Sequence, residues 1–473
     1  GLERALLRPV RRTPPRRTQG PPNLVLVGVD TLRHDHATAE RMPDVAALAR
    51  GGIVLDDVTA SSPWTLPSFS GALTGLMPGL HGAGLRGDRR NMDRQVPERL
   101  DAGATTLAQH LARHGYETAA FYANQFFAFG LAESFGSHRY LNLSAGDMLA
   151  VAADWIARHR DRPFCCFVLL NDPHEPTTPP PDLLARELDR LDEPPATVEE
   201  LHHLATWGDP TRPEAHLGLC GWPLPDAARR ARRLKLAIYR ATVRQVDRAL
   251  GRLADRLERL GLADQTVCTV FSDHGEEFCE HAAEAHAWNH DPRAVRGIGH
   301  GHTQFQELLR VPWISWGPGV PAAGTIARPA SLLDLAPTMV DWLGLDPLPL
   351  PTPAMPGLVG EPYDGDGDPS ERLLLAEATA FGPDVVALRR GGWKLIAHRD
   401  GRPLGLYDLA ADPHERDDLQ SVADDRVRQF QDTLASWRDA MADHRPGGDG
   451  ATRGWADLDD EVRRRLKDLG YGE

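Results

Sequence analysis

The feature that most constrains the fold is a short apolar run, Asn23 to Val29, which ends directly at the carboxylate of Asp30. An uninterrupted apolar run of this length is typical of a strand buried on both faces of a parallel sheet. Three similar runs follow, at 118–123, 164–170 and 265–271, and helical patterns separate them, at 105–114, 146–159 and 227–260. Strands that alternate with helices predict an α/β fold with a large, mostly parallel central sheet flanked by helices.

Polar residues follow these predicted strands at the point where each strand ends. They are Asp30, Asn124, the group 171–174 that contains Asp172 and His174, and the pair Asp273 and His274. Ligands of open parallel sheets bind beyond the carboxyl ends of the strands. The sequence therefore predicts that these side chains share one site.

The rest of the chain is predicted to form smaller units around a catalytic domain at 21–365. Residues 1–20 form a flexible basic tail, and two insertions in the catalytic domain, 176–225 and 280–299, interrupt the strand–helix pattern, the first as a candidate lid. Residues 366–446 hold three short strand-like runs and a helix, which predict a small antiparallel sheet with a packed helix. Residues 447–473 are expected to form a helical tail.

Charge and composition exclude several classes of protein. The chain has 53 Lys and Arg against 67 Asp and Glu, a formal net charge of −14, which argues against a nucleic-acid-binding surface. No apolar run approaches the roughly 20 residues that span a bilayer. The five cysteines are sparse and are expected to be buried free thiols.

The sequence leaves assembly and compartment less determined, and a homo-oligomer is one possible assembly. The cytoplasm is slightly favoured as the compartment, although a start at Gly1 leaves an upstream signal or anchor as an alternative.

Asp273 and His274 directly follow a predicted strand, so both can face one cation together with Asp30. An imidazole nitrogen with carboxylate oxygens suits Zn²⁺ or Mn²⁺ better than Ca²⁺ or Mg²⁺. One divalent metal is therefore expected, and a second one at Asp172, His300 or His302 is less favoured. Taken alone, Asp30 could equally be a helix cap, and the Asp–His pair could be a structural hydrogen bond.

Thr65 lies in a loop that enters a predicted helix, since Pro67 and Ser68 precede a pattern of small residues. A helix N-terminus favours a bound anion. A hydroxyl there can attack phosphorus or sulfur if a cation or a base lowers its pKa. Taken alone, Thr65 is more often an ordinary cap or loop residue.

The order of these motifs resembles the sulfatase branch of the alkaline phosphatase superfamily, over nearly all of residues 22–420. The matching stretches are 22–36, 64–82, 172–176, 239–251, 272–276, 299–312, 393–396 and 406–419. The resemblance implies a metal held by Asp30, Asp273, His274 and the Thr65 oxygen. It also implies a nucleophile at Thr65, substrate contacts or leaving-group protonation by His174 and His300, and substrate binding by Asn124 and His302.

The sequence also departs from the pattern of sulfatases that carry formylglycine. Those proteins have a Cys or Ser in a Cys/Ser-x-Pro-Ser-Arg loop, whereas this chain has Thr65 and, in the place of the Arg, Phe69. Thr31 stands where many sulfatases have a second Asp, and Asn124 stands near a sulfate-binding Lys. A Thr nucleophile with a nearby Asn resembles the phosphodiesterase and phosphotransferase branches of the superfamily.

The sequence therefore predicts a metal-dependent hydrolase or transferase of an anionic ester, with phosphodiesters favoured and a phospho-threonine intermediate at Thr65. The first alternative is a sulfatase, which hydrolyses sulfuric esters. The second is a catalytically silent, sulfatase-like binding protein. Against the second, Asp30, Asp273 and His274 are all present, although a decayed site is expected to lose such groups.

Overall fold

The computed structural model describes residues 20–87, 95–205, 226–288, 297–353, 355–362 and 372–442. Both predicted tails, apart from Gly20, lie outside these residues, as do 206–225 and 289–296 within the two predicted insertions. The domain boundaries given above stay predictions.

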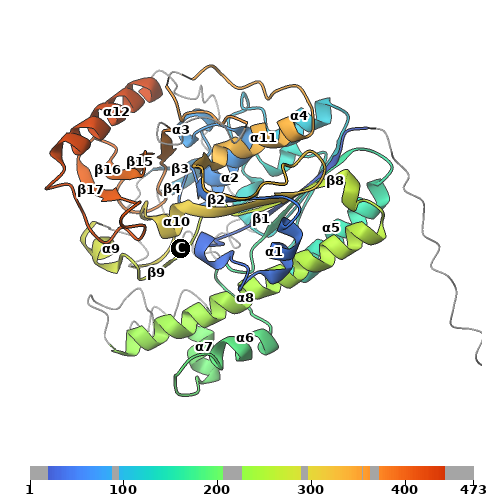
Figure 1. The fold of residues 1–473 in the computed structure, drawn as a ribbon, viewed down its shortest axis with the longest axis horizontal. Helices are drawn as coiled ribbons and strands as arrows, with labels where there is room; N and C mark the ends of the chain where they lie inside the picture. The colour runs from blue at the N-terminus through green and yellow to red at the C-terminus, as the bar shows by residue number, and fades with distance from the viewer. Residues whose placement is uncertain are drawn as a thin grey trace, which may run out of the picture.

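A nine-stranded sheet forms the centre of the molecule (Figure 1). Its strand order is β12 (Gly324–Ile326), β2 (Ile53–Thr59), β11 (Arg310–Trp316), β8 (Thr266–Phe271), β1 (Asn23–Val29), β7 (Phe164–Leu170), β5 (Glu117–Tyr122) and β6 (Ser137–Tyr140), and β13 (Ala330–Ser331) also pairs with β2. The four predicted apolar runs are β1, β5, β7 and β8, which run parallel to one another. The prediction of a mostly parallel α/β sheet is confirmed.

Helices cover both faces of the sheet (Figure 1). Leu24 and Leu26 of β1 contribute to the core with α2 (Thr65–Thr74), α4 (Leu107–Arg113) and α11 (Leu335–Trp342). Val25 and Val27 face the opposite core with α1 (Pro43–Ala49), α5 (Ala145–His159) and α8 (Asp226–Arg259). Successive side chains of a strand point to opposite faces, so a strand covered on both sides must be apolar throughout.

The described part of the first insertion packs on α8. Helices α6 (Pro181–Leu188) and α7 (Val198–Leu204) lie on the outer side of α8, away from the sheet (Figure 1). Leu204 forms an apolar cluster there with Leu234 and Ile238 of α8. A role as a lid over the site stays a prediction.

A small antiparallel sheet follows near the end of the described chain, as predicted, but it has four strands where three were predicted, and the additional one is the first. Its strands are β14 (Leu374–Ala376), β15 (Val385–Arg390), β16 (Trp393–His398) and β17 (Pro403–Asp408), in that order. Helix α12 (Asp424–Ala442) packs on this sheet through Phe430, Leu434 and Trp437, which are buried.

The remaining elements are short. They are the helices α3 (Pro78–His81), α9 (Ala282–Trp288) and α10 (Gln306–Leu309), and two small antiparallel pairs, β3 (Gly84–Gly87) with β4 (Gln95–Glu98) and β9 (Glu277–Phe278) with β10 (Ile298–Gly299).

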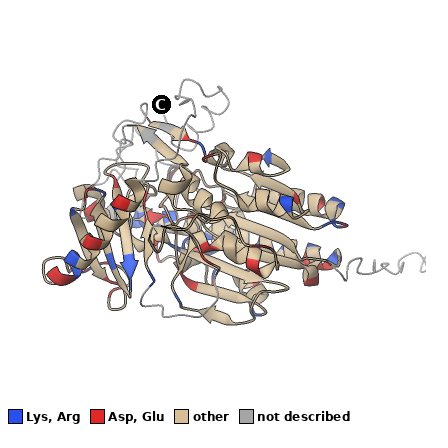
Figure 2. Ribbon diagram, turned by 90° about the horizontal axis from the view of Figure 1, so that it is seen from above, with Lys and Arg blue, Asp and Glu red and all other residues tan. Residues whose placement is uncertain are grey.

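Charged residues of both signs are interspersed along the described ribbon (Figure 2). None of the described helices combines the length and the apolar character that crossing a membrane requires. Cys165, Cys166, Cys268 and Cys279 are buried free thiols, as expected, and Cys220 lies outside the described residues.

Candidate active site

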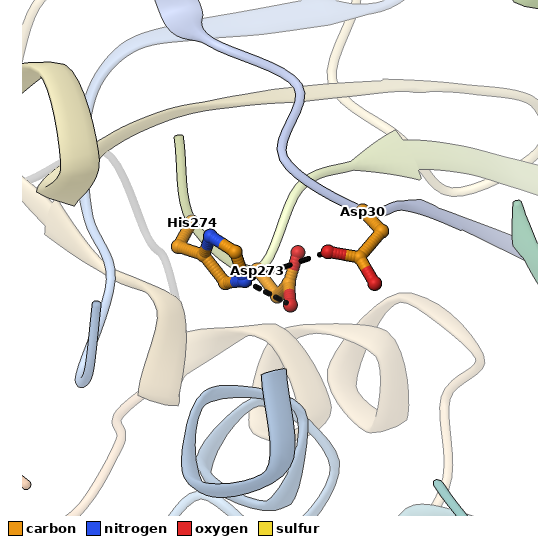
Figure 3. A group of neighbouring side chains, drawn as sticks. All are labelled: Asp30, Asp273 and His274. Carbon is orange, nitrogen blue, oxygen red and sulfur yellow. Dashed lines mark ion pairs between the residues drawn. The ribbon is translucent and has the colours of Figure 1, made fainter. Parts of the chain in front are cut away.

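The carboxyl ends of the central strands bring three predicted metal ligands together. Asp30 follows β1, and Asp273 and His274 follow β8, the neighbour of β1. His274 Nε2 lies 3.4 Å from Asp30 Oδ1 and 3.2 Å from Asp273 Oδ2. Figure 3 shows the two carboxylates and the imidazole turned toward one another. All three side chains are fully buried.

The predicted nucleophile lies against this group. Thr65 is the first residue of α2, as expected, and its Oγ1 is 3.4 Å from His274 Nε2. The Asn124 amide, which follows β5, donates to Asp30 Oδ2 at 2.7 Å and to Thr65 Oγ1 at 3.4 Å. The hydroxyl, the amide, the two carboxylates and the imidazole therefore form one buried cluster.

The electrostatics of the cluster call for a cation. Burial, and after it the charge of Asp273, raises the pKa of Asp30 to about 8. Burial alone would lower the pKa of His274, but the Asp273 and Asp30 charges outweigh it and raise that pKa to about 9. Two carboxylates that lie this close in a buried place repel each other unless positive charge is added.

The donor set fits a divalent metal. Among the described residues, one group of three possible ligands has its atoms within 4.8 Å of one another, and it consists of Asp30, Asp273 and His274. Asp30 Oδ1 and both Asp273 carboxylate oxygens accept no hydrogen bond from the described residues, although they are buried. His274 Nδ1 is hydrogen-bonded to the Gly275 carbonyl at 2.8 Å, which directs Nε2 to the cluster.

His174 and His300, both buried, lie at the edge of this cluster. The centroid of the His300 ring is 4.4 Å from that of His274 and 5.0 Å from that of His174. His174 Nδ1 is hydrogen-bonded to the carbonyl of Glu175 at 2.5 Å. His300 thus lies beside the ligand group, with His174 next to it, and the predicted role of both histidines toward a substrate stays a prediction.

Two other predicted residues make contacts of a different kind. His302 Nε2 is 2.7 Å from Glu277 Oε2, and both side chains are buried. Asp172 Oδ1 accepts a hydrogen bond from the Ala145 amide, at the start of α5. Substrate binding by His302 and a second metal at Asp172 stay predictions.

The structure also shows supporting residues that the sequence did not reveal. Ser68 Oγ donates to the Asp273 carbonyl at 2.6 Å and so ties α2 to the end of β8. Thr31, next to Asp30, has a left-handed backbone with φ of 59°, which is unfavourable for a β-branched residue. The Tyr239 hydroxyl donates to the Thr31 carbonyl at 2.8 Å and accepts from the Arg33 amide at 2.9 Å, and both bonds hold this turn.

The C-terminal sheet region also holds the loop that precedes Thr65. The Trp64 indole donates to the Ala378 carbonyl at 2.6 Å, and the Glu377 amide donates to the Ser61 carbonyl at 3.0 Å. The Ala380 amide donates to the Gly301 carbonyl at 2.7 Å, beside His300. The segment that follows β14 therefore fixes two loops of the site at once.

Phe69 explains how the chain accommodates its departure from the expected Arg. Its ring is fully buried and packs edge to face on Phe127, Phe167 and Phe271, with centroids 6.2, 5.9 and 5.8 Å away. A Cβ on Gly28 would come within 2.6 Å of this ring, so β1 and Phe69 fit only because residue 28 is glycine. Phe69 thus belongs to the core.

Comparison with known proteins identifies the family of the chain. The family model described as Sulfatase matches residues 22–345. Choline-sulfatase from Rhizobium meliloti (strain 1021) is 32% identical over 222 residues, which cover 46% of this chain and 38% of that protein. The chain therefore matches well under half the length of that relative.

Solved structures show the same fold. A protein solved in complex with its substrate D-glucosamine-2-N,6-O-disulfate has a TM-score of 0.65 and 17% identity, and the match covers 91% of this chain and all of that one. The phosphonate monoester hydrolase of Agrobacterium radiobacter has a TM-score of 0.62 and 20% identity, and covers 89% of this chain and 96% of its own. These structures show that the fold is shared, and the family match over residues 22–345 identifies the chain as a member of the sulfatase family.

Proposed function

We propose that the chain is a metal-dependent hydrolase of sulfuric esters, with the Thr65 hydroxyl as the nucleophile. The observation that carries this proposal is the position of Thr65 Oγ1, 3.4 Å from His274 Nε2 and beside the carboxylates of Asp30 and Asp273. The family supports the sulfuric ester, because its matched relatives include choline-sulfatase. The comparisons thus favour the alternative of the sequence analysis over the phosphodiester predicted there.

Asp30, Asp273 and His274 would hold the metal. A divalent cation there would supply Lewis-acid polarisation and compensate the buried negative charge. The residues present leave its identity among Zn²⁺, Mn²⁺, Ca²⁺ and Mg²⁺ open, with the imidazole favouring the first two.

Several residues of the site would each carry out one part of the reaction. The Thr65 hydroxyl loses its proton to water, and its oxygen attacks the sulfur of the ester, so that a Thr65 O–S bond forms while the ester S–O bond breaks. His174 or His300 donates a proton to the departing oxygen, which leaves as an alcohol. A water molecule then attacks the sulfur and the Thr65 O–S bond breaks, so that Thr65 regains its proton and the sulfur group leaves as sulfate. The histidine is reprotonated from water, which received the Thr65 proton in the first step. The Asn124 amide would exchange its long hydrogen bond to Thr65 Oγ1 for one to a non-bridging oxygen of the substrate.

A phosphoric ester is the second candidate, and the identity of residue 65 favours it. A threonine is not expected to be converted into the aldehyde that formylglycine sulfatases use, so the attacking group would be an ordinary alkoxide. Hydrolysis of a phosphate ester through an enzyme-bound phospho-threonine needs no such aldehyde. The same Thr65, His174, His300 and Asn124 would take the same roles around phosphorus.

The test is a comparison of chromogenic esters with the metal-loaded protein. The expected result is that p-nitrophenyl sulfate is turned over faster than p-nitrophenyl phosphate or bis(p-nitrophenyl) phosphate. Thr65→Ala is expected to abolish this turnover, whereas Thr74→Ala, at the other end of α2, is expected to retain it.

The other possible outcomes would support the second candidate function, a different nucleophile or the binding-protein alternative. Faster turnover of either phosphate ester would replace the first candidate by the second. Turnover that survives in Thr65→Ala would exclude Thr65 as the nucleophile. A metal-loaded protein that cleaves none of the three esters, and none in a wider panel, would support the binding-protein alternative.

A further inference from the structure

Two adjacent glutamates each pair with one histidine of the turn that follows β10. His300 Nδ1 lies 3.2 Å from Glu276 Oε2 and 3.4 Å from Glu276 Oε1. His302 Nε2 lies 2.7 Å from Glu277 Oε2. All four side chains are at most 4% exposed, so neither hydrogen bond competes with bulk water.

The two pairs differ in where their histidines lie. The His300 ring lies against His274 and His174, with centroids 4.4 and 5.0 Å away, and therefore belongs to the active-site cluster. His302 uses Nε2 for Glu277, whose other oxygen accepts the His281 amide at 3.2 Å. The two carboxylates thus have the same chemistry, but only Glu276 holds a ring of the cluster.

We propose that Glu276 is the positioning residue for His300: its carboxylate engages Nδ1 and thereby commits Nε2 to the substrate. This inference rests on the proposed function. The two nitrogens of an imidazole point away from each other, so engaging one fixes the direction of the other and the tautomer of the ring. Without Glu276, no carboxylate selects the ring nitrogen and the tautomer that proton donation to the leaving oxygen requires.

The main chain around His300 is held by hydrogen bonds of its own. Gly299 and Gly301 have φ of 85° and 83°, so His300 lies in a turn with a glycine on each side. The Gly301 amide donates to the Pro63 carbonyl, and the Gly301 carbonyl accepts from Ala380 and Phe381, so the main chain is held. These bonds fix the main chain, and the hydrogen bond to Glu276 engages Nδ1 of the ring.

The experiment compares Glu276→Gln and Glu276→Ala with Glu277→Gln as the matched control. Each variant is loaded with metal and assayed on the ester that the unaltered protein cleaves best, with metal content and melting temperature measured in parallel. Glu276→Ala is expected to lower kcat by about 10- to 100-fold, with a smaller change in KM and unchanged metal content. Glu276→Gln is expected to recover part of the loss, since an amide can still bond to Nδ1. Glu277→Gln is expected to keep kcat within about twofold, and any effect on substrate binding through His302 is expected in KM.

A double-mutant cycle separates positioning from general destabilisation. If Glu276 acts through His300, the variant that combines Glu276→Ala with His300→Ala is no slower than His300→Ala alone. Multiplied losses in the double variant, or an equal loss of kcat in Glu277→Gln, would overturn the proposal. The Thr65→Ala variant distinguishes a failure of the positioning role of Glu276 from a failure of the proposed function. Activity lost in Thr65→Ala but intact in Glu276→Ala refutes only the positioning role, whereas activity retained in Thr65→Ala refutes the proposed mechanism.

Discussion

The Asn124 amide donates a 2.7 Å hydrogen bond to Asp30 Oδ2, although the two residues are 94 positions apart in the chain. The bond links the ends of β5 and β1, which are separated in the sheet by β7. It leaves Asp30 Oδ1 facing His274. Asn124 therefore orients a candidate metal ligand from the neighbouring part of the sheet, in addition to any contact with substrate.

Asn124→Ala is expected to weaken metal binding by about 10- to 100-fold, as loss of a hydrogen-bond partner of a ligand usually does. Metal titration with a competing chelator measures this change. Asn23→Ala is the matched control, because Asn23 is a buried amide at the opposite end of β1. Equal metal affinity in Asn124→Ala and the unaltered protein would contradict the orienting role.

Removal of the metal is expected to lower thermal stability. A ligand that binds only the folded state stabilises it by about 2.7 kcal/mol at a free concentration one hundred times its Kd, and a chelator removes this contribution. Calorimetry with and without chelator measures the shift. Asp30→Asn is expected to abolish the response to chelator, yet to leave the metal-free protein at least as stable, because it removes one of two repelling carboxylates. A chelator response that persists in Asp30→Asn would place the metal elsewhere.

Gly28→Ala is expected to destabilise the protein by about 1–3 kcal/mol, because the new methyl group would overlap the Phe69 ring. Phe69→Leu alone loses edge-to-face contacts but opens space at this position. The double variant is therefore expected to be more stable than the sum of the single effects predicts, by about 1 kcal/mol. Urea unfolding of the four proteins measures this coupling, and strict additivity would show that the two residues do not constrain each other.

His281 gives an expected dependence of stability on pH. Burial alone would lower its pKa, but the charge of Glu307, whose Oε1 lies 2.6 Å from His281 Nδ1, outweighs it and raises the pKa to about 9. A raised histidine pKa adds stability that is fully present below about pH 6.5 and is lost as the pH rises to about 9. Relative to the unaltered protein, His281→Gln is thus expected to be less stable by about 1–3 kcal/mol at pH 6.

Urea unfolding at pH 6, 7.5 and 9.5 tests this expectation, with the exposed His414→Gln as the control. The curves of His281→Gln and the unaltered protein are expected to converge at the highest pH. A difference in stability that is the same at all three values would assign the contribution of His281 to packing on Phe305, whose ring centroid is 3.6 Å away, and not to its charge.

The central strands could be predicted because each is a continuous apolar run, and β1, β5, β7 and β8 agree with the predicted runs to within one or two residues. The two strands that lie between the edge strand β12 and β8, which are β2 and β11, could not be predicted from the sequence. In β2, Asp56 and Asp57 interrupt the apolar pattern, and they pair with Arg310 and Arg389 from distant parts of the chain. In β11, Pro312 lies at an irregularity in the pairing with β2, and a proline in a run argues against a central strand.

The candidate ligands could be predicted because they follow recognisable strands, whereas their supporting partners could not. Glu276 and Glu277 are adjacent in the sequence, and nothing in their order says that one holds a ring of the site and the other does not. That distinction depends on the turn at 299–301 and on the contact of Gly301 with Pro63. Likewise, Phe69 stands in a motif position and would be assigned to the site without the aromatic cluster around it.

The place of β1 between β7 and β8 has a consequence for biosynthesis. Among the strands of the central sheet, β1 is synthesised first, yet both of its hydrogen-bonding neighbours are synthesised much later. Thr65 likewise precedes its hydrogen-bonding partner His274 by 209 positions. Until β8 has left the exit tunnel, the nascent chain carries an apolar strand with open edges, which is a template for aggregation. Prematurely terminated products that lack β8 are therefore expected to depend on chaperones and to be degraded without ever gaining activity.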